Sequence, residues 1–575
     1  MHYDGILDHV GHFGKYQKLV VLALCLMQGP SACQFLAQVF LAANTDHWCL
    51  IPASEAINCT QLQLKSVSAC QEEQKNESIP YELDDDGKRV YSSCERYATA
   101  EDDGDQGWNS TDVIACDAGW DFDRSRYKST INDEFSLVCE REDFADIAQS
   151  VWFAGTLVGS LVWGSVADWL GRKAAFFLSL SLVSISSILT SFVPTFSAYM
   201  AARFITAACG YGVSLIASIA SKELVGPWKR VLVGAMHSIA FAVGYMLLSF
   251  AAFFLREWRH LQLAISLPYV VAFLLIPIFP ESPRWLISKG KFKEATKIIR
   301  KIAKVNGTTV PEDLINSSPE NADEQKKEIR SDTVRRVTHL DLFRTPNLRK
   351  KTLIIFLDWF AAVMVFYGLS LSTSALGVDD YIAAFVSGAV EIPSYLFCWF
   401  IMERIGRRLS LVGFYISAGV FCFISIFIPL GPARVAVAMA GKFAVSGAFS
   451  HIYTYSCEIY PTVVRSIGMG MSSMVGRISG ILCPIILLLG KYWEPLPLCV
   501  FGGSSLLAGT LSLMLPETLG CDLLDSIEEG EEFGKGQGFH LFSKSDPDAT
   551  TTATHLTNYM PLSTLDKHSD ETVSV

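Results

Sequence analysis

Twelve long apolar segments constrain the fold of this chain more than any other feature of its sequence. Each contains about 20 residues, and a helix of that length rises far enough to cross a hydrocarbon core of roughly 30 Å. The segments cover approximately residues 19–41, 147–167, 174–194, 197–219, 231–254, 262–280, 351–374, 380–402, 410–429, 433–455, 467–490 and 495–515. The sequence therefore predicts an all-α polytopic membrane protein with twelve transmembrane helices.

The composition of the 575 residues agrees with that prediction. Half of the residues are hydrophobic and only 18% are charged, against roughly a quarter in soluble domains. The net charge of −11 argues against a nucleic-acid partner. Much of the acid lies in two polar segments, residues 71–145 and 516–575, so the net charge says little about the membrane part.

Basic residues in short loops predict the orientation of the helices in the membrane. Most lie on one side, which we assign to the cytoplasm: Arg172, Lys173, Lys229, Arg230, Arg404, Arg407 and Arg408. Fewer lie on the other side, namely Arg256, Arg259 and Lys491. Because the number of spans is even, both termini, residues 1–18 and 516–575, are predicted in the cytoplasm. We expect the plasma membrane to be the location.

The loop of residues 42–146 is then extracellular, within a first six-helix bundle of residues 19–280. It contains six cysteines: Cys49, Cys59, Cys70, Cys94, Cys116 and Cys139. In an oxidising compartment these cysteines predict three disulfides, in any of fifteen pairings. Three Asn-X-Ser/Thr sequons, at Asn58, Asn76 and Asn109, predict glycosylation of the same loop.

Two polar segments lie on the predicted cytoplasmic side. Residues 281–350 link the bundles, and apolar residues recur at helical spacing between lysines over residues 292–302. This pattern predicts an amphipathic helix that lies under the bundle or on acidic lipid headgroups. The tail of residues 516–575 is acidic, then rich in Ser and Thr, and is predicted to be disordered. Its last residues, 573–575, could bind a PDZ groove as an added strand.

Short motifs recur between the two halves of the chain. Gly171, in a Gly-Arg-Lys loop, and Gly406, in a Gly-Arg-Arg loop, stand 235 residues apart. Glu281, in Pro-Glu-Ser, and Glu517, in Pro-Glu-Thr, stand 236 residues apart. Nearly equal offsets indicate two six-helix halves of the same orientation, the second covering residues 351–515. Parallel halves with a site at their interface suit transport by alternating access.

These loops resemble the signature of the major facilitator superfamily. The cysteine-rich outer loop and the motifs at residues 280–286, 458–462 and 516–518 are similar in order to the organic cation, organic anion and carnitine transporter family. The resemblance implies a cytoplasmic network of charge-assisted hydrogen bonds that holds one end-state closed. The network comprises Asp168, Arg172, Glu281 and Arg284 in the first half, and Glu403, Arg407, Glu458, Arg465 and Glu517 in the second.

Two charges lie near the midplane of predicted spans. Arg477 lies in the eleventh span, roughly 15 Å deep, and Glu391 lies at a similar depth in the eighth. A charge facing lipid there would cost several kcal/mol, so both side chains are expected to face protein or a watery cavity. They could form a buried ion pair that only holds two helices together. They could also form a site that satisfies a solute carrying both charges.

The resemblance to the family favours a solute-binding site over a structural ion pair. The resemblance implies an aspartate at the place of Arg477 in cation-selective members, and a lysine in the eighth span of anion-selective ones. The mixed pattern here resembles the carnitine and zwitterion branch, with a solute amine near Glu391 and a carboxylate near Arg477. Aromatic side chains would hold the amine by cation–π contacts. The aromatic candidates are Trp359, Phe366, Tyr367 and Phe241, and the polar candidates are Ser238, Ser450 and Tyr453.

Two more polar residues lie within predicted spans. Asp358 could relay a proton, help to hold a sodium ion, or pack two helices together. His237 is interpreted as a packing histidine. The coupling ion, sodium or proton, stays open at this point, and no cofactor or metal centre is expected.

The sequence thus predicts a secondary-active carrier of small organic cations or zwitterions, such as carnitine-like betaines, across the plasma membrane. An organic anion exchanger that uses Arg477 is the alternative, followed by a non-transporting glycosylated receptor. An enzyme is not expected, because the chain shows no nucleophile elbow, metal-ligand spacing or phosphate loop. Uptake is expected to survive loss of the tail after Leu519 but not the substitution Arg477→Ala.

Overall fold

The computed structural model describes residues 3–51, 72, 75–83, 89–99, 108–226, 229–311, 338–373, 377–521 and 524–535. Each of the twelve predicted spans corresponds to helical structure within these ranges. Eleven helical stretches are long and apolar enough to cross a membrane, and the twelfth span, α22 (Leu496–Ser512), is a shorter apolar helix. The predicted all-α polytopic architecture is therefore confirmed.

The first six spans form the first half of the bundle. The first span is interrupted and consists of α2 (Lys15–Cys25), α3 (Gln28–Leu36) and α4 (Gln38–Leu41). The others are α7 (Phe144–Leu170), α8 (Arg172–Thr190), α9 (Phe196–Glu223), α10 (Arg230–Phe254) and α11 (Trp258–Val271), which continues as η4 (Ala272–Leu275). The Thr195 hydroxyl accepts a hydrogen bond from the Ala198 amide and so caps the start of α9.

The second half repeats this arrangement. Its helices are α17 (Pro346–Leu371), α18 (Asp380–Ile405), α19 (Arg407–Ile426), α20 (Pro432–Ile459), α21 (Arg465–Leu488), followed by η6 (Leu489–Lys491), and α22. A proline begins α17 and another begins α20, where a helix does not need the missing N–H. Asp379 caps α18, because its carboxylate accepts from the amides of Tyr381 and Ile382.

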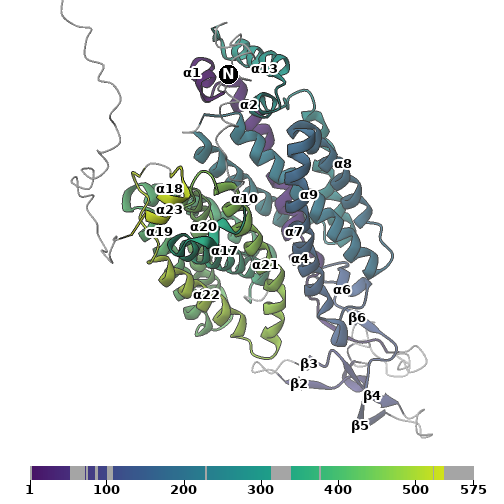
Figure 1. The fold of residues 1–575 in the computed structure, drawn as a ribbon. Coiled ribbons are helices and arrows are strands. Elements are labelled where there is room, and N and C mark those ends of the chain that lie inside the picture. Colours follow the sequence, from purple (N-terminus) through teal and green to yellow (C-terminus); the bar gives the residue numbers. More distant parts are fainter. Residues whose placement is uncertain are drawn as a thin grey trace, which may run out of the picture. The chain divides into compact units, whose positions relative to one another are not determined.

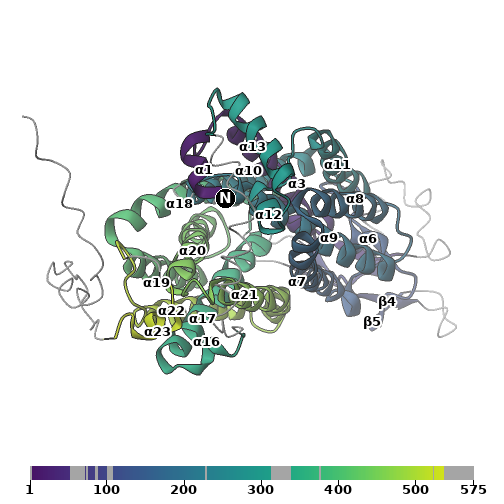
Figure 2. The same cartoon turned by 45° about the horizontal axis from the view of Figure 1, so that its top comes forward.

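The two halves meet along two pairs of helices, α10 with α18 and α7 with α21 (Figure 1). Figure 2 shows α7 beside α21 from a second direction. Small residues allow this close approach. A Cβ on Gly388 would lie 3.0 Å from Met246 Cγ, and one on Gly480 would lie 2.6 Å from the Phe153 ring. The helices of the two halves therefore approach each other closely at Gly388 and at Gly480, where a larger side chain would not fit.

The described residues of the predicted extracellular loop form three two-stranded antiparallel sheets. The strand pairs are β1 (His47–Cys49) with β6 (Trp120–Phe122), β2 (Tyr81–Leu83) with β3 (Arg89–Tyr91), and β4 (Glu95–Thr99) with β5 (Trp108–Ala115). The short helices α6 (Ile131–Glu134) and η2 (Cys139–Arg141) lead back to the membrane. The loop is therefore a small folded domain, which the sequence predicted only through its cysteines.

Two disulfides cross-link the described residues of this domain. Cys49 is bonded to Cys116, and Cys94 is bonded to Cys139. The structure thus selects among the pairings that the sequence left open, and a disulfide-bonded domain is confirmed. The remaining predicted cysteines, Cys59 and Cys70, lie outside the described residues.

The predicted glycosylation sites have different surroundings. Asn58 lies outside the described residues, and Asn109 lies in β5, where the structure describes only the backbone. Asn76 is half-buried, and its Oδ1 accepts a hydrogen bond of 2.6 Å from the Tyr91 hydroxyl. Glycosylation of the three sites stays a prediction.

The amphipathic pattern forms α13 (Phe292–Asn306), which follows α12 (Pro283–Ser288). Its apolar residues belong to the same buried cluster as residues of α1 (Tyr3–Val10). Asn306 ties the segments together, because its Nδ2 donates to Val10 O at 3.0 Å and its Oδ1 accepts from Tyr16 N at 3.0 Å. Of the two predicted positions, the helix therefore lies under the bundle, with its apolar face against the chain's own N-terminal segment.

The expectation of a disordered tail from residue 516 is wrong for residues 524–535. These residues form α23 (Ile527–Glu532), which packs against the start of α17. The Glu531 carboxylate accepts hydrogen bonds from the amides of Asn347 and Leu348, both at 2.9 Å. The first amides of a helix lack intrahelical acceptors and favour negative charge, so an acidic segment finds a partner there. The predicted PDZ ligand, residues 573–575, lies outside the described residues.

Candidate functional site

A glycine with positive φ and a glutamate organise the loop after the second span. Gly171 has φ 98°, and this backbone conformation ends α7 and starts α8 in a sharp turn. The Glu281 carboxylate accepts from the amide of Arg172 at 2.7 Å and from that of Lys173 at 3.2 Å. The Arg172 guanidinium in turn bonds Asp168 at 2.7 Å. Asp168, Arg172 and Glu281, three of the predicted residues of the first half, thus form one cluster.

The loop after the eighth span has the same construction. Gly406 has φ 103°, and Glu517 accepts from the amides of Arg407 at 2.7 Å and Arg408 at 3.0 Å. The Arg407 guanidinium lies 3.3 Å from Glu458. The internal repeat that the sequence predicted is therefore visible down to individual hydrogen bonds.

Glu223, at the end of α9, is a member of the first cluster that the sequence analysis missed. Its carboxylate lies 2.8 Å from Arg172, as the Glu458 carboxylate lies near Arg407. Glu223 and Glu458 stand 235 residues apart, which is the offset of the two glycines. Applying the repeat offset to Glu458 was the signal that could have found it.

Three predicted network residues lie at the margin of the two clusters. Glu403 is exposed. Arg284 lies with its guanidinium 5.8 Å from the centre of the Tyr3 ring, and Arg465 donates to Tyr460 O at 3.1 Å. The ion pairs of Arg172 and of Arg407 each join helices of one half.

Arg477 projects from α21 toward the first half, as its depth required. Its guanidinium donates to Ser473 O at 2.8 Å and to the hydroxyl of Tyr211, on α9. The same group lies 4.4 Å from the centre of the Tyr211 ring, a cation–π contact. Its Nε is buried without a hydrogen-bond partner, and Arg477 forms no ion pair with any described residue. The Nε of Arg477 is therefore a donor without an acceptor among the described residues.

Glu391 pairs with a lysine and not with Arg477. The side chain of Glu391 is fully buried, and its Oε1 lies 3.1 Å from Nζ of Lys442, on α20. The Tyr395 hydroxyl donates to the other carboxylate oxygen at 3.0 Å. The considered alternative of a Glu391–Arg477 ion pair is wrong, because a nearer cation reaches the carboxylate.

Lys442 is the functional candidate that the sequence analysis missed. Its ammonium lies 3.3 Å from the centre of the Phe366 ring and donates to Phe366 O at 3.1 Å and to the Ser370 hydroxyl. It is a single lysine within the tenth apolar span, so the depth argument applied to Arg477 and Glu391 also applies to it.

The predicted aromatic residues belong to one chain of rings across the interface. Ring centres are 4.4 Å apart for Trp359 and Tyr453, and 5.1 Å apart for Phe366 and Tyr367. Phe449 bridges these two pairs, at 5.6 Å from Tyr453 and 5.1 Å from Phe366. The structure thus connects Trp359, Phe366 and Tyr367, which share one predicted span, with Tyr453 of another span.

The chain of rings continues into the first half. Tyr367 stacks on Phe35 at 4.7 Å, and Phe35 lies 6.3 Å from the predicted Phe241. Phe35 and Phe449 are therefore members that the sequence did not single out. The predicted serines, Ser238 and Ser450, are both half-buried, and Ser238 donates to the backbone of its own helix.

His237 and Asp358 are both buried. The His237 ring nitrogens lie 3.0 Å from Gln28 Nε2 and 3.1 Å from the Ser221 hydroxyl, which agrees with a packing role. Asp358 accepts from the Ser512 hydroxyl at 2.8 Å, whereas its Oδ2 accepts no hydrogen bond. That free oxygen leaves the proton and sodium roles of Asp358 open.

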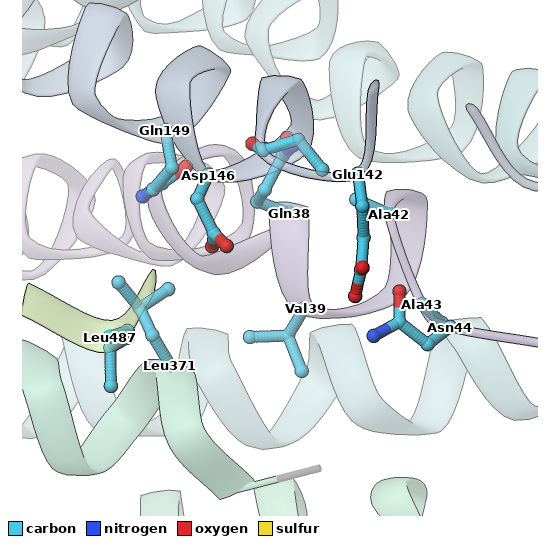
Figure 3. A pocket seen from close by; sticks show the side chains of 11 residues that line it. Gln38, Val39, Ala42, Ala43, Asn44, Glu142, Asp146, Gln149, Leu371 and Leu487 are labelled. Carbon is cyan, nitrogen blue, oxygen red and sulfur yellow. The ribbon is translucent and has the colours of Figure 1, made fainter. Parts of the chain in front are cut away.

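A cavity of about 130 Å³ lies at the predicted outer end, between the two halves. Figure 3 shows Gln38 and Gln149 of the first half and Leu371 and Leu487 of the second around it. Ion pairs cross between the halves near this end. Lys491 binds Glu142 at 3.2 Å and also Asp143, and Arg126 binds Asp379 at 2.9 Å. The two halves are thus linked electrostatically at the outer end.

Comparisons with known proteins identify the family. Residues 133–524 match the family described as sugar (and other) transporter. The chain is 39% identical to the organic cation transporter protein of Drosophila melanogaster, over 93% of this chain and 95% of that protein. It is 34% identical to the human organic cation/carnitine transporter 2, over 92% and 93% of the two chains.

A solved structure shows the same fold. The inward open form of the xylose transporter XylE from E. coli superposes with a TM-score of 0.54 at 16% identity, covering 70% of this chain and 92% of that one. The twelve spans in two halves thus adopt the major facilitator fold, and the relatives are transporters, not enzymes. This chain belongs to the organic cation, organic anion and carnitine transporter family of the major facilitator superfamily.

Proposed function

We propose that this transporter moves small solutes that carry both an ammonium and a carboxylate, such as carnitine-like betaines, across the plasma membrane. The free Nε of Arg477 is the observation that carries the proposal. A buried donor without an acceptor is unfavourable, and a solute carboxylate would satisfy it with a charge-assisted hydrogen bond. The relatives named for organic cations and carnitine support the amine end of the solute.

The aromatic rings support a cation at the other end of the solute. Phe366 already holds an ammonium on its face, that of Lys442. Tyr367 extends the same row of rings to Phe35 in the first half. Because the row crosses the interface between the halves, a solute bound there would contact both of them, as alternating access requires.

We further propose that this arrangement is the one closed toward the outside. The ion pairs of Lys491 with Glu142 and of Arg126 with Asp379 hold the halves together at the outer end. The clusters around Arg172 and Arg407 would each hold the helices of one half together. Their role in gating stays a proposal. Opening toward the outside requires the outer pairs to separate.

Uptake into liposomes tests the proposed function. The purified full-length protein is reconstituted and supplied with one of three probes: γ-butyrobetaine, its methyl ester, or the carbon isostere in which carbon replaces the quaternary nitrogen. We expect saturable uptake of γ-butyrobetaine, and stronger competition from it than from either analogue. Uptake of the isostere alone would support the anion-exchange alternative, and uptake of none of the probes would reject the proposal. Repeating the assay without sodium, and with an imposed pH gradient, identifies the coupling ion.

The predicted orientation places both termini in the cytoplasm, where residues 573–575 would be accessible to a PDZ domain. Protease protection of terminal epitope tags in sealed vesicles of known sidedness tests the orientation. Binding of the C-terminal peptide to PDZ domains, with and without its last three residues, tests the partner.

A further inference from the structure

The ammonium of Lys442 occupies the place at which a solute amine was expected. It lies 3.1 Å from Glu391 Oε1 and 3.3 Å from the centre of the Phe366 ring. A carboxylate beside an aromatic face is the combination that binds an alkylammonium ion. The chain therefore supplies its own ligand for this pair of groups.

The contact between Lys442 and Glu391 is a fully buried ion pair. Glu391 Oε1 lies 3.1 Å from the ammonium, which also donates to Phe366 O and to the Ser370 hydroxyl. The carboxylate of Glu391 is therefore already occupied by a cation from the chain.

The charges of the buried Glu391 and Lys442 and the half-buried Arg477 do not balance within this set. Glu391 contributes one negative charge, and Lys442 and Arg477 contribute one positive charge each. The repeat offset places Thr156, Ala207 and Ala242 at the matching positions of the first half, so that half adds no charge there. The set thus has an excess of one positive charge, at Arg477. A solute with only an ammonium meets this excess, whereas a solute with a carboxylate neutralises it.

We propose that Lys442 is a specificity-determining residue, an exchangeable internal cation on Glu391 and Phe366 that selects solutes bearing a carboxylate as well as an ammonium. This proposal rests on the proposed function. A solute amine would have to displace the lysine, and only the gain at Arg477 makes that exchange favourable. Without Lys442, the amine site would be open and cations without a carboxylate would be accepted.

The ratio of uptake of the γ-butyrobetaine methyl ester to that of γ-butyrobetaine tests the proposal. We expect Lys442→Gln to raise this ratio by about tenfold or more, because the competing cation is gone. Lys442→Arg keeps the positive charge and is the matched control, expected to leave the ratio close to that of the wild type. A purely structural lysine would change total uptake and thermal stability but not the ratio.

A second variant guards against misfolding. Lys442→Gln alone leaves Glu391 buried without its cation, so the double variant Glu391→Gln/Lys442→Gln removes both charges together. This variant keeps the excess positive charge at Arg477, so it should keep the low ratio of the wild type while Lys442→Gln raises it. A raised ratio in the double variant, or an unchanged ratio in folded Lys442→Gln, overturns the proposal. If the wild type takes up γ-butyrobetaine and the ratio does not move, only the role of Lys442 fails. If the wild type takes up no probe, the proposed function fails, and the role of Lys442 fails with it.

Discussion

The guanidinium of Arg477, in the second half of the bundle, lies on the ring of Tyr211, in the first half, and donates a hydrogen bond to its hydroxyl. The cationic group of the candidate site is therefore itself a contact between the halves. A carboxylate that binds Arg477 competes with this hydroxyl for the guanidinium. Under the proposed function, solute binding and the contact between the halves would be linked at this one side chain.

This relationship predicts different effects for the two residues. Arg477→Ala should weaken binding of γ-butyrobetaine by roughly 10- to 100-fold, since hydrogen bonds to charged groups contribute about 1.5–3 kcal/mol. Its methyl ester should be affected far less. Tyr211→Phe keeps the ring under the guanidinium and should change KM by only about threefold. KM values from liposome uptake check this, and normal KM for γ-butyrobetaine in Arg477→Ala would remove Arg477 from the site.

The outer ion pairs predict a measurable change in accessibility. Arg126→Ala removes the contact with Asp379, and the hydroxyl of Tyr127 alone then holds the neighbouring Asp380, at 3.0 Å. We expect the outer end to open more often. A cysteine introduced by Val39→Cys, in the outer cavity, should then react severalfold faster with a membrane-impermeant maleimide.

The matched control for that experiment is Arg124→Ala. Arg124 is exposed close to Arg126 in the chain and forms no ion pair with the described part of the protein. The protein without the Val39→Cys change reports the labelling of the native thiols. Equal labelling rates in the Arg126→Ala and Arg124→Ala backgrounds would show that the outer pairs do not hold this end closed.

Alanine substitutions at the two loop glycines should destabilise the protein. A Cβ would lie 2.5 Å from Glu281 Oε2 at Gly171 and 2.6 Å from Glu517 Oε2 at Gly406, and both positions have positive φ. Such backbone positions cost about 1–3 kcal/mol for other residues. Thermal unfolding in detergent should show a lower Tm for each variant. The control is Gly413→Ala, where a Cβ meets nothing within 4 Å, and a similar Tm in all three variants would contradict the prediction.

The docked tail segment revises the expectation that uptake survives loss of the tail after Leu519. That truncation removes α23 and leaves Lys351 without Gly530 O and Phe533 O, to which its ammonium donates. Because the truncation removes these hydrogen bonds and the packing of α23 on α17, we expect a lower Tm and reduced uptake. Truncation after Lys535 keeps α23 and is the matched control, expected to behave as the full chain. Equal stability of the two truncated proteins would show that the segment is dispensable.

The same contact predicts a dependence on pH. Burial raises the pKa of Glu531, but hydrogen bonds from Leu348 N–H, Thr345, Asn347 N–H and Lys535 outweigh it and lower the pKa to about 2. An unfolded glutamate has a pKa of about 4.3. The stabilisation by the carboxylate is thus complete above about pH 4.3 and is lost as pH falls toward 2. The difference in Tm between the wild type and Glu531→Gln should shrink across this interval, and a constant difference would contradict the assignment.

Much of the fold follows from local properties of the sequence. Each span was predicted from its own length and apolar composition, because the bilayer imposes the same requirement on every segment. The loops at Gly171 and Gly406 were predicted as repeats, and their hydrogen bonds match. Helix α23 was missed because its acidic composition is typical of disorder, while its partner amides at the start of α17 lie 184 residues away in the chain.

The candidate site was predicted in part. Depth in an apolar span singled out Arg477 and Glu391; Glu391 is fully buried, and the half-buried Arg477 contacts protein groups of both halves. Their partners were not predictable in the same way. Tyr211 and Lys442 come from other helices, and only the packing of α9 and α20 brings them within contact.

By itself, the sequence determined that this protein crosses a membrane twelve times in two related halves and buries charge in the second. The spans and their charges follow from the cost of placing each segment in hydrocarbon, which depends on that segment alone, and the two halves follow from the repeated loop motifs. Only the tertiary structure decided that Glu391 is neutralised by Lys442 while Arg477 keeps a free donor. Electrostatic pairing depends on distances of a few ångströms between helices, and separation along the chain does not determine these distances.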